Sequence, residues 1–153
     1  MAKPEQVTIK FMFITASGRT MPEIAVAAGL NHAAELVNEA VIALLTLRNT
    51  EKTGEKIVRI NPLDEKVDEI ENLKLDPSKP SNMLAEMTIP AARADYLRTI
   101  FNDNDCAGIM TEAFYTYDRL VSETQAGFEI AVVDDPENIT RYHPLEIGHM
   151  VPE

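Results

Sequence analysis

The sequence predicts an α+β fold in which helices cover one face of an antiparallel sheet. Two patterns lead to this prediction: apolar residues alternate with polar ones in several short segments, and they recur every three or four residues in the segments between. Hydrophobic residues make up 45% and charged residues 25% of the chain, as is usual for globular proteins. The length of 153 residues fits a single domain over residues 1–153.

The first predicted elements are a strand and a helix. Large apolar side chains occupy every second position of residues 7–13, which is typical of a strand with one buried face. A helix is expected to begin at Thr20 and to continue to about Arg48. Thr20 and Glu23 have the spacing of a capping box, and Pro22 lies in the first turn, where no amide donor is lost.

Two details of this helix remain open in the sequence. Residues 29–31 (Gly-Leu-Asn) are expected to kink or split it. Between residues 40 and 47 only Thr46 is polar, so this part belongs either to the centre of the core or to a surface that a second subunit covers. On this basis we expect a homo-oligomer.

A second strand is predicted over residues 56–60, and an acidic crossover segment over residues 62–80 follows it. Within the crossover, Val67, Ile70 and Leu73 recur at helical spacing. We therefore expect a short amphipathic turn of helix there, ended by the prolines that follow.

The remaining elements follow the same two periods. A strand over 83–89 leads into a helix over about 90–101, and a last strand covers 128–133. Residues 107–121 fit either a helix or a strand, and we favour a helix. The tail over 134–153 is predicted to be irregular.

This order of elements contains the split β-α-β-β-α-β plan, the ferredoxin-like arrangement, with an extra helix or strand before the last strand. That plan supports enzymes, small-molecule sensors and protein-binding modules, so the fold class does not assign a function.

The net charge of −11 is unevenly distributed along the chain. Residues 1–60 contain seven Lys or Arg and six Asp or Glu, whereas residues 61–153 contain seven and nineteen. The two parts therefore carry +1 and −12. A field of this sign repels phosphate backbones and anionic lipids, so we expect neither direct nucleic-acid binding nor membrane binding.

The acidic crossover is the first candidate site. It would attract a basic protein by long-range electrostatics, and its few apolar side chains would add affinity. The first functional hypothesis is therefore a non-enzymatic binding protein of the inhibitor, immunity or adaptor type. The expected partner-binding residues are Asp64, Glu65, Asp68, Glu69 and Glu71. The bland alternative is a solvated crossover that links two strands.

The loop before the first helix is the second candidate site. Ser17, Gly18, Arg19 and Thr20 form a small loop at a helix N-terminus, where free amides and the helix dipole attract anions. The alternative hypothesis is thus a small-molecule-binding domain that holds an anionic ligand such as a nucleotide. The competing interpretation is that Thr20 and Glu23 only cap the helix.

No residue pattern indicates an enzyme, a cofactor or a metal site. Asp103, Asp105 and Gly108 match part of an EF-hand calcium loop, but Phe114 stands where that loop requires a bidentate glutamate. The single cysteine, Cys106, cannot form an internal disulfide and has acidic neighbours that oppose a reactive thiolate. Together with the absence of a secretory pattern, this leads us to expect a cytoplasmic protein.

Overall fold

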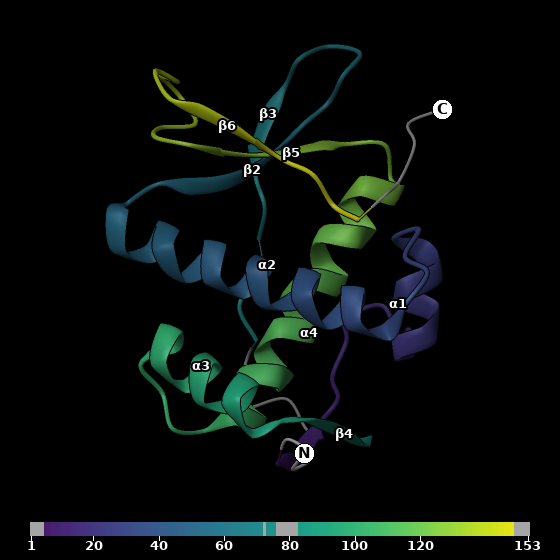
Figure 1. Ribbon diagram of the computed structural model, residues 1–153. Coiled ribbons are helices and arrows are strands. Elements are labelled where there is room, and N and C mark those ends of the chain that lie inside the picture. Colours follow the sequence, from purple (N-terminus) through teal and green to yellow (C-terminus); the bar gives the residue numbers. More distant parts are fainter. Residues whose placement is uncertain (1–4, 72, 76–82, 149–153) are drawn as a thin grey trace.

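The computed structural model describes residues 5–71, 73–75 and 83–148. It contains four helices and six strands within these ranges (Figure 1). In chain order they are β1 (Gln6–Met12), α1 (Met21–Ala27), α2 (Ala33–Thr53), β2 (Lys56–Ile60), β3 (Val67–Glu69), β4 (Leu84–Pro90), α3 (Ala91–Phe101), α4 (Cys106–Gln125), β5 (Glu129–Val133) and β6 (Tyr142–Leu145). The predictions of strands at 7–13, 56–60, 83–89 and 128–133 and of a helix at 90–101 are confirmed within one or two residues.

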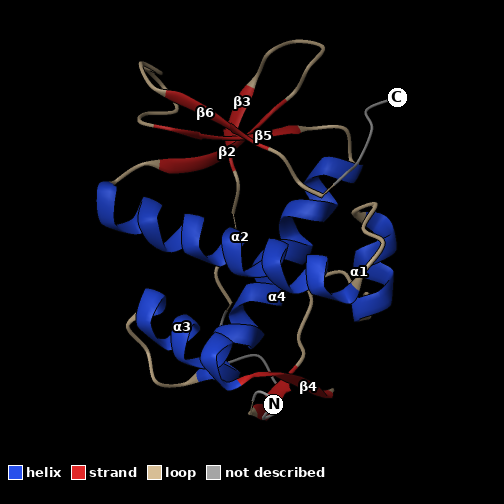
Figure 2. Cartoon of the chain, viewed as in Figure 1, coloured by secondary structure: helices blue, strands red, loops and turns tan. Residues whose placement is uncertain are grey.

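The strands form two antiparallel sheets rather than one. β1 pairs with β4 in a two-stranded sheet, and the other sheet has the order β3-β2-β5-β6. The two sheets lie at opposite ends of the molecule, with α2 and α4 between them (Figures 1 and 2). The α+β class with antiparallel strands is therefore confirmed, whereas the ferredoxin-like strand order is not. Alternation identifies the buried face of a strand but not the strand with which it pairs.

Helix α4 is the centre of the core, because it contacts β1 of one sheet and β5 of the other as well as α2 and α3. On the β1 side, the rings of Phe11 and Phe13 each lie 5.6 Å from the ring of Phe114. The ambiguous stretch 107–121 is thus a helix, as favoured. Helix α4 is buried on nearly all sides, and three of its polar residues, Thr116, Asp118 and Glu123, are buried as well.

The helix expected over residues 20–48 is split into α1 and α2. Gly29 adopts a positive φ of 72°, and the amide of Leu30 donates to the carbonyl of Ala25 (2.8 Å), which closes α1. Of the apolar residues between 40 and 47, only Ile42 is exposed. The chain itself therefore covers this stretch, and the sequence argument for a second subunit is removed; the oligomeric state stays a prediction.

The prediction of a short helix within 62–80 is wrong. Residues 67–69 form β3, which pairs with β2, and the described residues that follow, 70, 71 and 73–75, are not helical. The amide of Ile70 donates to the carbonyl of Ile57 (3.2 Å), and Thr116 Oγ1 donates to the carbonyl of Leu73 (2.9 Å). Ile70 and Leu73 are buried, so their spacing reflects docking onto the core and not a helical turn. Residues 76–80 of this segment lie outside the described residues.

The tail over 134–153 is not irregular throughout, because residues 142–145 form β6 at the edge of the larger sheet. Its pattern did not predict a strand, since Pro144 lacks an amide donor and Tyr142 and His143 are exposed. Residues 149–153 lie outside the described residues. Within the described part of the chain, none of the helices has an apolar run that could cross a membrane.

Candidate functional site

The tip of the β2–β3 hairpin is a closely hydrogen-bonded turn. The amide of Asn61 donates to the carbonyl of Lys66 (2.9 Å), and the amide of Glu65 donates to the carbonyl of Asn61 (2.8 Å). Side chains add two bonds, from the amide of Leu63 to Asn61 Oδ1 (3.0 Å) and from the amide of Lys66 to Asp64 Oδ1 (2.9 Å). The turn presents Leu63 to solvent with 93% of its surface exposed, next to the exposed Asp64 and Glu65.

The expected partner-binding residues all lie on this hairpin or directly after it. Four of them are exposed and the fifth is half-buried: Asp64, Glu65, Glu69 and Glu71, and then Asp68. Asp68 pairs in register with Arg59 on β2. The hydrogen bond that Arg59 donates to Glu123 is the main cause that raises the pKa of Arg59, and Asp68 and Glu71 raise it further. The positive charge of Arg59 therefore lies close enough to Asp68 and Glu71 to interact with both, although its ion-pair partner is Glu123.

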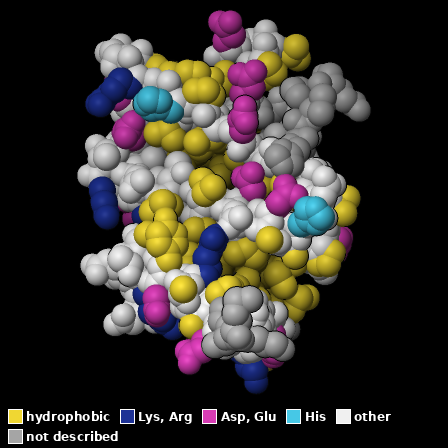
Figure 3. Space-filling view, viewed as in Figure 1, with side chains coloured by type: hydrophobic (Ala, Val, Ile, Leu, Met, Phe, Trp, Pro, Cys, Tyr) yellow, Lys and Arg dark blue, Asp and Glu magenta, His cyan; other side chains and the backbone are white. Residues whose placement is uncertain are grey.

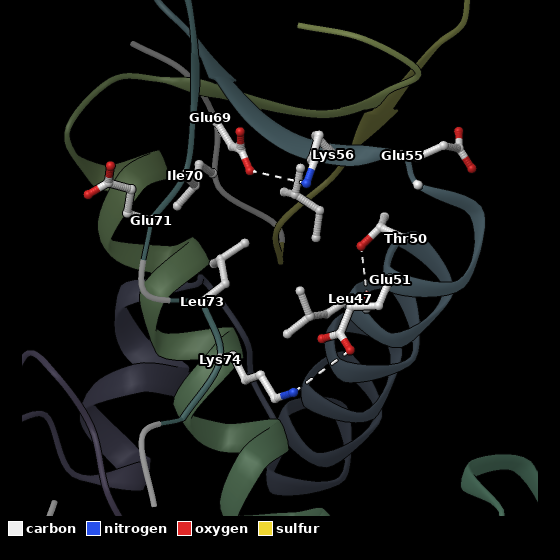
Figure 4. A pocket seen from close by; sticks show the side chains of 12 residues that line it. Leu47, Thr50, Glu51, Glu55, Lys56, Glu69, Ile70, Glu71, Leu73 and Lys74 are labelled. Atoms are coloured by element: carbon white, nitrogen blue, oxygen red, sulfur yellow. Dashed lines mark hydrogen bonds and ion pairs between the residues drawn. The ribbon is translucent and has the colours of Figure 1, made fainter. Parts of the chain in front are cut away.

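A groove lies at the base of the hairpin, between the C-terminal end of α2, strand β2 and residues 69–74. Its volume is about 600 Å³. Aliphatic side chains form its walls, and Leu47, Ile70 and Leu73 point into it from both sides (Figure 4). Ile57 lines it from β2. The groove thus combines an aliphatic patch, formed by these four side chains, with polar and charged groups.

Two ion pairs lie at the rim of the groove. Lys56 Nζ lies 3.7 Å from Glu69 Oε1, and Lys74 Nζ lies 3.8 Å from Glu51 Oε2 (Figure 4). All four side chains are exposed by about half or more. Ion pairs this long and this exposed contribute little to stability. The lining residues include four glutamates and two lysines, so the groove carries a net charge of −2.

The loop over residues 17–20 packs against α4. Arg19 Nη1 donates to Asp118 Oδ1 (3.0 Å) and to Ser122 Oγ (2.8 Å), while Nη2 donates to Gln125 Oε1 (2.6 Å). Ser17 Oγ also donates to Asp118 Oδ1 (2.8 Å). Asp118 is fully buried, so these donors replace the water that its carboxylate lost on folding.

Thr20 and Glu23 form the predicted capping box at the start of α1. Glu23 Oε1 accepts from the amide of Thr20 (3.2 Å) and from its hydroxyl (2.9 Å). A bound anion would meet this carboxylate and would compete with Asp118 for Arg19. The loop therefore serves the fold through every polar contact given above, and the anion site stays a prediction.

The aspartates near the start of α4 also have a structural role. Asp105 caps the helix by accepting from the amide of Gly108 (3.0 Å), and Asp103 accepts from the amide of Asp105 (2.9 Å). Cys106 is buried, and its thiol donates to the carbonyl of Ala94 (3.5 Å). Desolvation raises the pKa of this thiol, which opposes thiolate chemistry. Among the described residues, no three His, Cys, Asp or Glu side chains gather as metal ligands would.

The sequence did not predict that α2 lines a groove, nor that α4 makes polar contacts with distant parts of the chain. No sequence pattern marks Glu51 and Lys56 as part of a site, since only the fold brings them beside residues 69–74. Asp118 did have a signal. It lies four residues after Phe114 and three before Val121, and therefore on the apolar face of the helix, where a carboxylate needs an internal partner.

Comparison of the chain with protein-family models, with curated proteins and with solved structures finds no match.

Proposed function

We propose that this chain is a non-enzymatic binding protein that engages a basic protein partner through the β2–β3 hairpin. The observation that carries this proposal is the hydrogen-bonded tip, which exposes an apolar side chain, Leu63, directly before the acidic Asp64 and Glu65. A preorganised turn loses little conformational entropy on binding, and an apolar residue within a charged rim is the usual anatomy of an interface. The proposal covers inhibitor, immunity and adaptor proteins alike.

The position of the hairpin supports this proposal. It projects from the end of the molecule that carries the larger sheet, away from α2 and α4 (Figure 1). Acidic side chains are visible at this end, at the top of the space-filling view (Figure 3). Negative charge on a projecting element steers a basic partner toward it and raises the association rate at low salt.

The test is capture of the partner from an extract of the source cells on immobilised protein, with identification by mass spectrometry. A tip variant combines Leu63→Ser, Asp64→Asn and Glu65→Gln. The matched control combines Val26→Ser, Glu86→Gln and Asp95→Asn, which removes one exposed apolar residue and two exposed acids elsewhere.

We expect a basic protein to be captured by the wild type and the control, to be eluted by salt, and to bind the tip variant at least about tenfold more weakly. If the same proteins bound the tip variant and the control equally, at low and high salt, the proposal would be wrong.

A further inference from the structure

We infer that the groove at the base of the hairpin receives one long basic side chain, an arginine or a lysine, of the partner protein. This inference rests on the proposed function and specifies the chemistry that the partner presents. Three properties of the groove lead to it: its aliphatic walls, the two carboxylates on opposite sides of its rim, and its net negative charge.

The walls suit the stem of such a side chain. Ile57, Ile70 and Leu73 are almost fully buried, so they present only a thin apolar lining to the groove. Arginine and lysine carry three or four methylene groups below the charged head, and these groups pack well along apolar surface while the head stays at the rim. A short polar or anionic side chain would leave this lining uncovered.

The rim of the groove suits the charged end of an arginine or lysine side chain. Glu51 belongs to α2 and Glu69 to β3, so carboxylates stand on both sides of the opening. Their present partners, Lys74 and Lys56, are exposed and lie 3.8 and 3.7 Å away. An exposed ion pair of this kind changes an equilibrium by no more than about fivefold. An incoming guanidinium can therefore take over a carboxylate at little cost, and it binds in a bidentate way that an ammonium cannot.

The net negative charge of the groove favours a cationic ligand. Glu55 and Glu71 point away from the middle of the groove (Figure 4), yet they keep its surroundings negative, since both lysines of the lining are already paired. An anionic group would meet the carboxylates of Glu51 and Glu69 at the rim and an excess of negative charge around it. A cation on an aliphatic stem is the class of side chain that fits both the walls and the rim.

The inference is tested by titrating the 15N-labelled protein with N-acetyl-arginine methylamide and following the backbone amides by NMR. We expect saturable shifts, with a Kd in the millimolar range, centred on the lining residues of α2, β2 and 69–74. The citrulline analogue, which has the same shape without the charge, is expected to bind at least about fivefold more weakly. The lysine analogue should fall between them.

Single variants separate the groove from general acidity. Glu51→Gln and Glu69→Gln are each expected to weaken arginine binding by about threefold to tenfold, and Glu86→Gln, an exposed glutamate on β4, should leave it unchanged. Shifts of equal size around Glu86 and around the groove, or equal binding of arginine and citrulline, would overturn the inference.

The two proposals can fail separately. The tip variant leaves every lining residue of the groove in place, and the groove variants leave the tip in place. Partner capture that depends on the tip, together with no arginine binding, would overturn the groove inference alone. Arginine binding in the groove, together with capture that ignores the tip, would overturn the proposed function.

Discussion

The carboxylates of α4 and those of the β2–β3 hairpin are the same chemical groups in opposite settings. On α4, Asp118 and Glu123 are buried and bind arginines: Arg19 Nη1 lies 3.0 Å from Asp118, and Arg59 Nη1 lies 2.9 Å from Glu123. Around the hairpin all the acids but the half-buried Asp68 are exposed, and the ion pair of Glu69 is longer and involves a lysine. The inner set, Asp118 and Glu123, ties distant parts of the chain together, and the outer set around the hairpin faces solvent.

This difference shows that the charge count along the sequence is not a map of the surface. The net of −12 over residues 61–153 includes Asp118 and Glu123, which the fold withdraws from solvent. Arg19, which pairs with Asp118, and Arg59, which pairs with Glu123, come from residues 1–60; Arg119 of α4 itself also pairs with Glu123. The neutral and acidic parts of the sequence therefore meet in space, and part of the charge asymmetry is cancelled inside the molecule.

The largest expected effect is on the free energy of unfolding, when one of the buried carboxylates of α4 is changed. Asp118→Asn removes the charge that faces Arg19 and leaves the donors of Arg19 and Ser17 without a full acceptor. Breaking a buried pair from one side is costly, and Arg19 keeps some access to water, so we expect a loss of about 3 kcal/mol in the free energy of unfolding. Denaturant titration measures it. Asp95→Asn, an exposed aspartate on α3, is the control, with a change within about 0.5 kcal/mol. Equal losses in the two variants would erase the distinction between inner and outer carboxylates.

A smaller effect of opposite sign is expected at Tyr117, the polar group of α4 that the fold leaves unpaired. Its hydroxyl is fully buried and has no hydrogen-bond partner among the described residues. Tyr117→Phe removes this unsatisfied group with almost no change in shape, so we expect the protein to become more stable by about 1 kcal/mol. Tyr96→Phe, at an exposed tyrosine, should change nothing. Destabilisation by Tyr117→Phe would show that the hydroxyl has a partner after all.

The same tyrosine predicts an alkaline dependence. Burial, and to a lesser extent Glu39, raises the pKa of Tyr117 in the folded protein. In the unfolded chain the tyrosine ionises near pH 10, as model peptides do, whereas the folded protein keeps its proton. Ionisation of this tyrosine therefore leaves the free energy of unfolding unchanged below about pH 10. Above that pH only the unfolded chain loses the proton, so the folded protein becomes less stable as the pH rises. The variant Tyr117→Phe should lose less stability than the wild type between about pH 9 and pH 11.

The smallest expected effect is on the outer set. Glu69→Gln breaks an exposed, long ion pair with Lys56, so its free energy of unfolding should stay within about 0.5 kcal/mol of the wild type. Denaturant titration measures this change as well. A loss above about 1 kcal/mol would mean that Glu69 belongs with the structural carboxylates, and the groove would then be a poor candidate for exchange with a partner.

Local patterns in the sequence predicted most of the elements. Alternation located four strands, and the spacing of Thr20 and Glu23 located the capping box. The short β3 and β6 were missed, because three or four residues contain too little of a repeat to separate a strand from a loop. Just after β3, the buried Ile70 and Leu73 have the spacing of a helical turn, although each packs into the core from a segment that is not helical.

The candidate site was predicted in part. The acidic residues from Asp64 to Glu71 were noticed because they lie close together in the chain. The groove was not recognised, because Leu47 and Glu51 of α2 face Ile70 and Leu73 only after β2 has folded back along the helix. The loop from Ser17 to Thr20 looked free in the sequence, and Asp118, some hundred residues away, engages it in the fold.

By itself, the sequence determined the α+β class, the position of the main helices and strands, and an acidic segment after the second strand. Each of these depends on interactions within a few residues, which composition and period reflect directly. Only the tertiary structure decided that the strands form two sheets, that α4 and not α2 is the centre, and that Asp118 and Glu123 are buried beside arginines from the other part of the chain. These features depend on contacts between distant residues, and no local pattern records which distant residue a side chain will meet.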